Sequence, residues 1–367
     1  MAAVSPRPGA TGRDPRVGAR TPTGADPATG AHPADVLRGV PDLEAVLGPR
    51  PQFSVMKVIP RLDHHCRAWL ASATLAIVGS VDENGARIDI LGGPPGVFTS
   101  DETGLDAPGL PADLPEGCRL GGLVLVPGVG ETLRVNGRLR RLAGVARLEV
   151  TEAYVHCAKA LLRSRLWSPA DGSVVCDADD TTDPSWQSAL LRSPFLAVAS
   201  CAPSEGGADV SPRGDPAPAA RVLDDGRIVI PDRPGNRRAD TMRNLLVDPR
   251  VAVAAFVPGS DRVVRVRGRA SLSTDPALRA AGVVRGHEPD VVIVVEPEHA
   301  DVRTEPALGA ARLWDASRHV SPGTLPRASR MWLDHVRASQ TPDRPDLVPS
   351  ERDMADDIAI AYRDYLY

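Results

Sequence analysis

"VPGVGETLRVNGRL" (residues 126–139) and "VPGSDRVVRVRGRA" (residues 257–270) align without a gap, and this repeated stretch decides the fold. Each copy opens with a Val-Pro-Gly turn and continues through Arg-Val-x-Gly-Arg. Apolar and polar residues alternate along both copies, which is typical of a strand with one buried face. The same strand is therefore predicted twice in one chain.

Two further pairs of segments flank this strand in the same order. "CRAWLASATLAIVGS" (66–80) parallels "WQSALLRSPFLAVAS" (186–200), and "SRLWSPADG" (164–172) parallels "ARLWDASRH" (311–319) with Arg-Leu-Trp aligned. Three matched blocks in one order indicate an internal repeat of roughly 150 residues. We predict a tandem duplication of one domain.

The segments between these blocks predict a mostly β fold with added helices, in which each half forms a small antiparallel barrel. Residues 36–72 have two helical patterns, and residues 74–91 have the pattern of a β-hairpin. We expect a disordered tail over residues 1–35, a first domain over 36–170, a linker over 171–186 and a second domain over 187–367 that ends in helices. The two halves are expected to pack as an intramolecular pseudo-dimer, so that the chain is a monomer.

The composition excludes several classes of protein. The chain has 367 residues, 42% of them hydrophobic, and a net charge of -4, which argues against general nucleic-acid binding and against a membrane surface. It has no long apolar run and no apolar signal core, so we expect a cytoplasmic protein without a transmembrane helix. Five cysteines form no Cys-x-x-Cys pair, and the adjacent His64 and His65 point in different directions on a helix, so no metal site is predicted.

The stretch "VIPDRPGNRRADTMRNLL" (229–246) places two arginines directly before a predicted helix. The start of a helix already carries partial positive charge and unpaired N–H groups, so adjacent arginines there are unfavourable without an anion. A phosphate group would satisfy both features. The alternative is a solvated turn whose arginines are surface charge.

The two halves have lost different parts of one pattern. The Arg-rich turn and the Ser-Pro-Arg-Gly-Asp segment before it occur only in the second half. The first half instead keeps His156, Lys159, Arg163 and Trp167. Their spacing of three, four and four residues would place them on one face of a helix. The aligned residues of the second half are Arg303, Pro306, Ala310 and Trp314. We infer one composite site, built from residues 211–215 and 236–244 on one side and 156–167 on the other. Independent drift of the two copies is the alternative.

At these residues the chain resembles the pyridoxamine 5'-phosphate oxidase-like, FMN-binding split-barrel family. The motifs are "DVSPRGDPAPA" (209–219), "IPDRPGNRRADTMRNLL" (230–246), "PGVGETLRVNGRL" (127–139) and "HCAKALLRSRLW" (156–167), and the likeness extends over roughly residues 36–367. The resemblance implies two split β-barrels with FMN between them. A duplicated single chain departs from the family's usual homodimer of single-domain chains.

The resemblance also implies roles for individual residues. Cofactor-binding residues would be Ser211, Arg213, Asp215, Asn236, Arg237, Arg238, Asp240, Thr241, Asn244 and Trp167. Within this set, Arg213 and the turn at 236–238 would hold the ribityl phosphate, and Trp167 would form an aromatic wall unless it is a core residue. His156, Lys159 and Arg163 would be the catalytic donors beside the flavin edge where charge develops, with a structural hydrogen bond as the alternative for His156. The family's Pro-Pro-Gly-Phe is here Pro-Ala-Pro-Ala at 216–219, without its glycine and aromatic residue.

These observations predict an FMN-dependent oxidoreductase that acts on a small organic molecule, and we hypothesise a specialised biosynthetic pathway. One alternative is a split-barrel enzyme that binds haem, with His156 as the axial ligand, or a deazaflavin. Another is a non-catalytic protein that binds a flavin or another ligand.

Overall fold

The computed structural model describes residues 35–168, 185–202, 207–321, 323–339 and 349–367. The predicted tail and linker lie outside the described residues, except for Asp35, Ser185 and Trp186. Ser185 caps a helix that begins at Trp186. No helix in the described part of the chain is long and apolar enough to cross a membrane.

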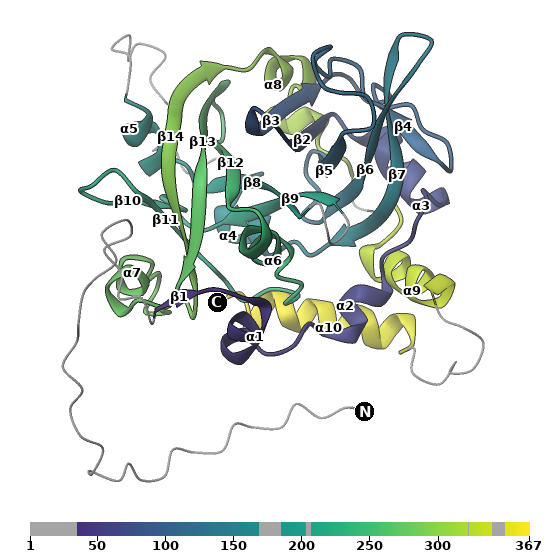
Figure 1. The fold of residues 1–367 in the computed structure, drawn as a ribbon. Helices are drawn as coiled ribbons and strands as arrows, with labels where there is room; N and C mark the ends of the chain where they lie inside the picture. Colours follow the sequence, from purple (N-terminus) through teal and green to yellow (C-terminus); the bar gives the residue numbers. More distant parts are fainter. Residues whose placement is uncertain (1–34, 169–184, 203–206, 322, 340–348) are drawn as a thin grey trace, which may run out of the picture.

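The first half forms a six-stranded antiparallel sheet in the order β3-β2-β5-β6-β7-β4 (Figure 1). Its strands are β2 (Leu75–Asp82), β3 (Gly85–Gly92), β4 (Gly104–Asp106), β5 (Arg119–Leu125), β6 (Thr132–Leu142) and β7 (Val145–His156). The predicted hairpin is β2 and β3, which pair from end to end.

The second half forms an eight-stranded antiparallel sheet with the path β9-β8-β12-β13-β14-β11-β10. Its strands are β1 (Val36–Leu37), β8 (Phe195–Ala202), β9 (Gly207–Gly214), β10 (Arg221–Val222), β11 (Ile228–Pro231), β12 (Arg250–Phe256), β13 (Arg262–Ser273) and β14 (Val292–Thr304). The two aligned Arg-Val-x-Gly-Arg strands are β6 and β13, and each shifts its pairing register at the glycine of that motif. The predicted mostly β fold is confirmed, and the corresponding strand orders support the duplication.

Helices cover the edges and ends of both sheets. They are α1 (Val40–Leu47), α2 (Gln52–Met56), α3 (His64–Ser72), α4 (Lys159–Ser164), α5 (Trp186–Leu191), α6 (Asp240–Val247), α7 (Pro276–Ala281), α8 (Pro306–Ala311), a 3-10 turn (Ala316–Arg318), α9 (Ala328–Ser339) and α10 (Glu351–Asp364). Two of these helices pack against the half of the molecule to which they do not belong in the sequence. Leu43 of α1 packs into the core of the second sheet, and Met331 of α9 packs into the core of the first. Each half therefore covers part of the other half's core.

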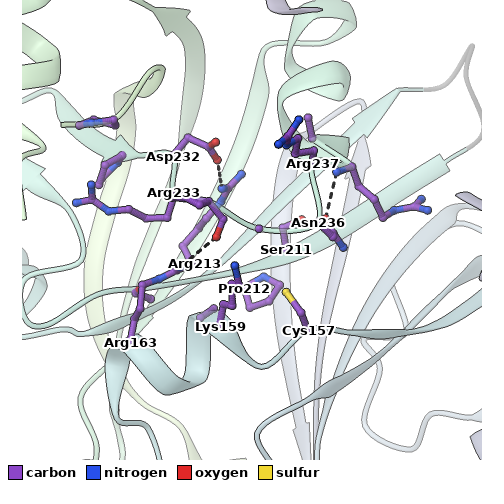
Figure 2. Close-up of a pocket in the computed structure, with 18 of the residues that line it drawn as sticks. Cys157, Lys159, Arg163, Ser211, Pro212, Arg213, Asp232, Arg233, Asn236 and Arg237 are labelled. Atoms are coloured by element: carbon purple, nitrogen blue, oxygen red, sulfur yellow. Dashed lines mark hydrogen bonds and ion pairs between the residues drawn. The ribbon is translucent and has the colours of Figure 1, made fainter. Parts of the chain in front are cut away.

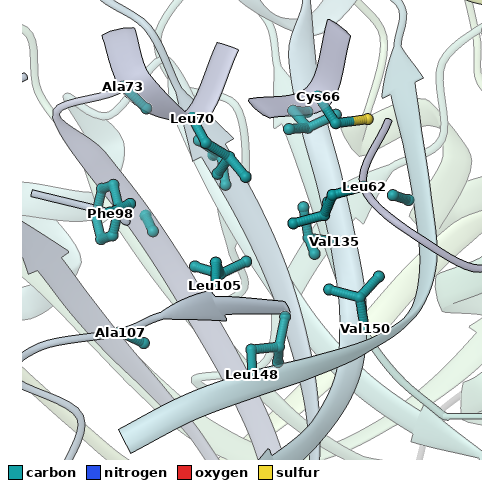
Figure 3. Packing of buried hydrophobic residues seen from close by; sticks show 14 of the residues in the cluster. Leu62, Cys66, Leu70, Ala73, Phe98, Leu105, Ala107, Val135, Leu148 and Val150 are labelled. Atoms are coloured by element: carbon teal, nitrogen blue, oxygen red, sulfur yellow. The ribbon is translucent and has the colours of Figure 1, made fainter. Parts of the chain in front are cut away.

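Each sheet wraps around an apolar core of its own, and a third core lies between the sheets. Figure 3 shows the first of these, in which Leu62 and Leu70 face Val135 and Val150. The third core joins residues of β2, β3 and β5 to residues of β8, β9 and β12. The sheets therefore pack face to face, as the predicted pseudo-dimer requires.

The contact between the halves is repeated in equivalent positions. A methyl group on Gly92 would collide with the carbonyl oxygen of Ala307, and one on Gly214 would collide with that of Ala160. The Arg-Leu-Trp alignment makes Ala160 and Ala307 counterparts. The indole nitrogens of both tryptophans donate to carbonyl oxygens at aligned positions, Trp167 to Val129 at 2.6 Å and Trp314 to Ser260 at 2.8 Å.

Phe256 tests how far stability depends on the core between the sheets. It is buried there against Phe195, with ring centroids 5.8 Å apart. We expect Phe256→Ala to lower the free energy of unfolding by about 3–5 kcal/mol, because it removes a large buried side chain and leaves a cavity. Leu142→Ala, at a side chain that is 57% exposed, is the control. Equal denaturation midpoints for the two variants would contradict a shared core between the halves.

Candidate functional site

A cavity of about 570 Å³ lies where the two halves meet, within the usual size range of small-molecule sites (Figure 2). The end of β7 and helix α4 line it from the first half, and β9 and the segment between β11 and α6 line it from the second. Predicted residues on its wall are His156, Lys159, Arg163, Ser211, Arg213, Asp215, Asn236, Arg237, Arg238 and Asp240. The two separated groups of the predicted composite site thus lie in one cavity.

Trp167 does not line this cavity, so its predicted role as an aromatic wall is wrong. Helix α4 ends at Ser164 because Arg165 has a left-handed backbone with φ of 50°. The three-four-four spacing therefore does not continue to Trp167, which packs into the core between the sheets. His156 also lies outside the helix, at the end of β7.

Lys159 and Arg163 do share one face of α4, and both are buried. Their donors already have partners in the last residues of the chain. Lys159 Nζ donates to the carbonyl oxygen of Tyr365 at 2.5 Å, and Arg163 Nη1 donates to that of Leu366 at 2.8 Å. Burial lowers the pKa of both side chains. The C-terminal segment therefore holds the two cations that were predicted to face a ligand.

His156 differs from its predicted role as a donor. Burial lowers its pKa well below the ordinary value of 6.5, with nearby Arg134 and Lys57 as further causes, so the ring is neutral at pH 7. Its Nδ1 lies 3.3 Å from the carbonyl oxygen of Cys157. A hydrogen on Nδ1 makes that contact a hydrogen bond and leaves Nε2 as an acceptor. His156 is therefore a neutral ring that makes the structural hydrogen bond named above as its alternative role, and its Nε2 can accept a hydrogen bond.

The wall contributed by the second half has donors without partners in the described part of the chain. Arg213 pairs with Asp232 at 2.5 Å, yet its buried Nε has no acceptor. Asn236 accepts from the backbone of Arg238 at 3.1 Å, and its buried Nδ2 has no acceptor either. The exposed Arg237 forms no ion pair with a described carboxylate, and its φ of 51° is left-handed. These three groups fit an anionic ligand such as a phosphate.

Arg238, the second arginine of the turn, has a structural role. Its side chain is buried and donates from Nε to Asp240 at 2.7 Å and from Nη1 to the carbonyl of Ser54 at 2.7 Å. Its guanidinium also lies 4.4 Å from the ring centre of Tyr154, whose hydroxyl donates to Asp240 at 3.2 Å. Asp240 is thereby fixed at the start of α6.

The remaining predicted residues have hydrogen-bond partners within the protein or lie outside the cavity. Ser211 donates to Asp209 at 2.8 Å, and Asp215 accepts from Arg233 at 2.7 Å. Thr241 and Asn244 lie on α6 and do not line the cavity, and Asn244 donates to Ser200 at 3.1 Å.

Sequence reasoning missed several residues of this site. Arg134 of β6 is buried and pairs with Asp209 of β9 across the interface between the halves. Its place in the repeated strand motif was the available signal, since the aligned Arg265 likewise donates to the carbonyl of Ile88 in the other half. Arg233 and His287 also line the cavity, and the ring of Tyr367 stacks on His287 with centroids 5.8 Å apart.

Residues 182–303 match the family model described as pyridoxamine 5'-phosphate oxidase. This part of the chain is similar to that family. It contributes the wall of the cavity with the free donors. No curated protein matches the chain.

Several solved structures resemble the chain, each over 32% of its length. They include HupZ of Group A Streptococcus, with 16% identity, 91% of that chain covered and a TM-score of 0.27. An F420 reductase has 21% identity, 98% coverage and a TM-score of 0.25. A pyridoxamine 5'-phosphate oxidase-related, FMN binding protein from Nostoc punctiforme PCC 73102 has 14% identity, 78% coverage and a TM-score of 0.21.

Lys57 lies fully buried behind the inner wall of the site. Its Nζ donates to the carbonyl oxygen of Val155 at 2.9 Å and lies 4.5 Å from the ring centre of Trp332. Burial lowers the pKa of this ammonium group from 10.5 to about 7. Between these two values the folded chain releases a proton that the unfolded chain retains.

This difference predicts how stability depends on pH. Because the unfolded state binds more protons, Lys57 contributes a free energy of unfolding that rises by ~1.4 kcal/mol per pH unit between about pH 7.5 and about pH 9.5. We expect Lys57→Met to remove this rise, which denaturant unfolding at several pH values measures. Arg352→Met, at a side chain that is 91% exposed, should keep the slope of the unchanged protein. Parallel slopes for all three proteins would contradict a buried, neutral Lys57.

Proposed function

We propose that this protein is an FMN-dependent oxidoreductase that acts on a small organic molecule, with one flavin site between its two halves. The observation that carries the proposal is the cavity at their junction, in which donors without partners from the second half face a basic helix from the first. A flavin supplies hydride transfer when it is bound.

Arg213, Asn236 and Arg237 would hold the phosphate of FMN. The first turn of α6 lines the same part of the cavity, and its N-cap residue, Ala239, has no side chain that could cap it. A helix start with open N–H groups favours an anion, and an adjacent guanidinium adds a charged hydrogen bond. These features answer why two arginines precede this helix: Arg238 builds the turn and Arg237 remains available.

Lys159 and Arg163 would supply positive charge beside the flavin ring. Their side chains are fixed by carbonyl oxygens, so they need little reorganisation when negative charge develops nearby. The neutral His156 would accept a hydrogen bond from the bound ligand at Nε2. The segment 365–367 covers these groups and would limit access of water to them.

The counterpart position supports a single site. Arg265, which aligns with Arg134, lines a smaller cavity of about 410 Å³ between the halves. Arginines at this smaller cavity pair with carboxylates, Arg87 with Asp89 at 3.1 Å and Arg303 with Asp301 at 2.6 Å. The Asn-Arg-Arg turn has no equivalent there. We therefore propose one flavin per chain, in a cytoplasmic monomer whose two halves form the usual interface internally.

Cofactor content and affinity test this proposal. We expect the purified protein to bind about one FMN per chain. Arg237→Ala should weaken FMN binding ~10–100-fold, because it removes a charged hydrogen bond worth about 1.5–3 kcal/mol. The measurement is a titration of cofactor-free protein with FMN, followed by its visible spectrum, with Arg352→Ala as the matched control.

Each other outcome has a definite meaning. Two FMN per chain would contradict the single site. A Soret band that is lost in the His156→Ala variant would show that the bound cofactor is haem and not FMN. Release of a deazaflavin on denaturation would show that the cofactor is a deazaflavin. If the protein binds FMN but oxidises no added reductant, the non-catalytic alternative would be favoured.

A further inference from the structure

A second cavity, of about 920 Å³, opens beside the first and shares His156, Cys157, Lys159, Gly235 and Asn236 with it. Helices α9 and α10 form its other walls. Most of its surface differs in chemistry from the basic cavity next to it. Apolar side chains that line it are Phe53, Val155, Trp332, Met354 and Ile358.

Two aromatic rings define one wall of this second cavity. Phe53 and Trp332 meet edge to face, with centroids 6.0 Å apart and an interplanar angle of 88°. The indole nitrogen of Trp332 is buried and has no acceptor among the described residues. Such a wall favours a planar, apolar ligand.

Glu131 places a carboxylate in this apolar space. Its Oε1 accepts a hydrogen bond from the Tyr362 hydroxyl at 3.1 Å, and that hydroxyl accepts from the backbone of Ala158 at 2.9 Å. Burial raises the pKa of Glu131. Among the described residues no lysine, arginine or histidine forms an ion pair with it. A partly buried carboxylate without a cation is unfavourable, so this position favours a cationic ligand.

The rim of the second cavity has the same sign of charge. Asp353 and Asp357 lie one turn apart on α10, both exposed, and neither forms an ion pair with a described cation. Among the described residues of the cavity wall, the one cation is Lys159, whose ammonium group donates to Tyr365. Carboxylates therefore dominate the electrostatics of this space, whereas arginines dominate those of the neighbouring cavity.

We propose that this second cavity binds an apolar, ring-bearing organic amine in its protonated form, with the ring against Phe53 and Trp332 and the ammonium group toward Glu131. As a binding site it stands without any cofactor. That its ligand is the substrate rests on the proposed function, since the shared residues place this space directly beside the proposed flavin site. A phosphorylated or carboxylated ligand would meet like charge here.

Three matched indoles test the proposal by titration calorimetry on the full chain: tryptamine, its alcohol tryptophol, and indole-3-propionate. We expect tryptamine to bind at least ~10-fold more tightly than tryptophol, and indole-3-propionate to bind most weakly. Glu131→Gln should reduce tryptamine affinity ~10-fold and leave tryptophol unchanged. Asp225→Asn, which removes a distant, half-exposed carboxylate, is the control and should change neither.

Equal affinities for amine and alcohol, no binding of any of the three, or an unchanged Glu131→Gln variant would overturn the proposal. If Glu131→Gln does not fold, Asp357→Asn replaces it, because this exposed side chain can change without loss of structure. Asp357→Asn should reduce the affinity for tryptamine by a smaller factor than Glu131→Gln and leave the affinity for tryptophol unchanged. Titration with and without FMN separates the two proposals: amine binding by a protein that binds no FMN would leave this site standing and refute the flavin site alone.

Discussion

The carbonyl oxygen of Ala160 lies against Gly214 so closely that a methyl group on this glycine would collide with it. That contact fixes α4 of the first half on β9 of the second. Lys159 and Arg163 lie on this short helix, and Arg213 directly precedes the glycine, so the same contact brings the basic groups of both halves together. Because the core between the sheets is apolar, the hydrophobic effect holds this geometry. The site exists only while the halves are joined.

Charge is placed in this interface at a cost that the apolar cores must offset. Arg134 and Asp209 are both buried, and replacing either alone would leave an unpaired charge inside the protein. Two further arginine–carboxylate ion pairs lie around the cavity, Arg233 with Asp215 and Arg238 with Asp240. These pairs fix the positions of the backbone segments that carry the free donors. Rigid donors of this kind bind an anion without first having to be ordered.

Much of this architecture could be predicted from the sequence, because repeats and strand alternation are local properties. The two strands with Arg-Val-x-Gly-Arg, the hairpin at 74–91 and the separate contributions of the halves all follow from such patterns. Trp167 could not be placed correctly, since one left-handed residue, Arg165, ends the helix that its spacing implied. The covering segment at 365–367 and the surroundings of Glu131 depend on contacts between residues more than 200 positions apart. Lys159 and Tyr365 are 206 positions apart, and Glu131 and Tyr362 are 231 apart. Periodicity carries no information about such contacts.

Two sheets of corresponding strand order in one chain can differ in what each preserves. A symmetric dimer of identical chains has two equal sites, and every substitution affects both. In a single chain the two sites can diverge, and here the arginines at the smaller cavity pair with neighbouring carboxylates. The C-terminal helices pack on the first half, where α9 joins its core and α10 lines the apolar, acidic cavity. The same asymmetry between the halves thus places this cavity beside the one with the arginine-rich wall.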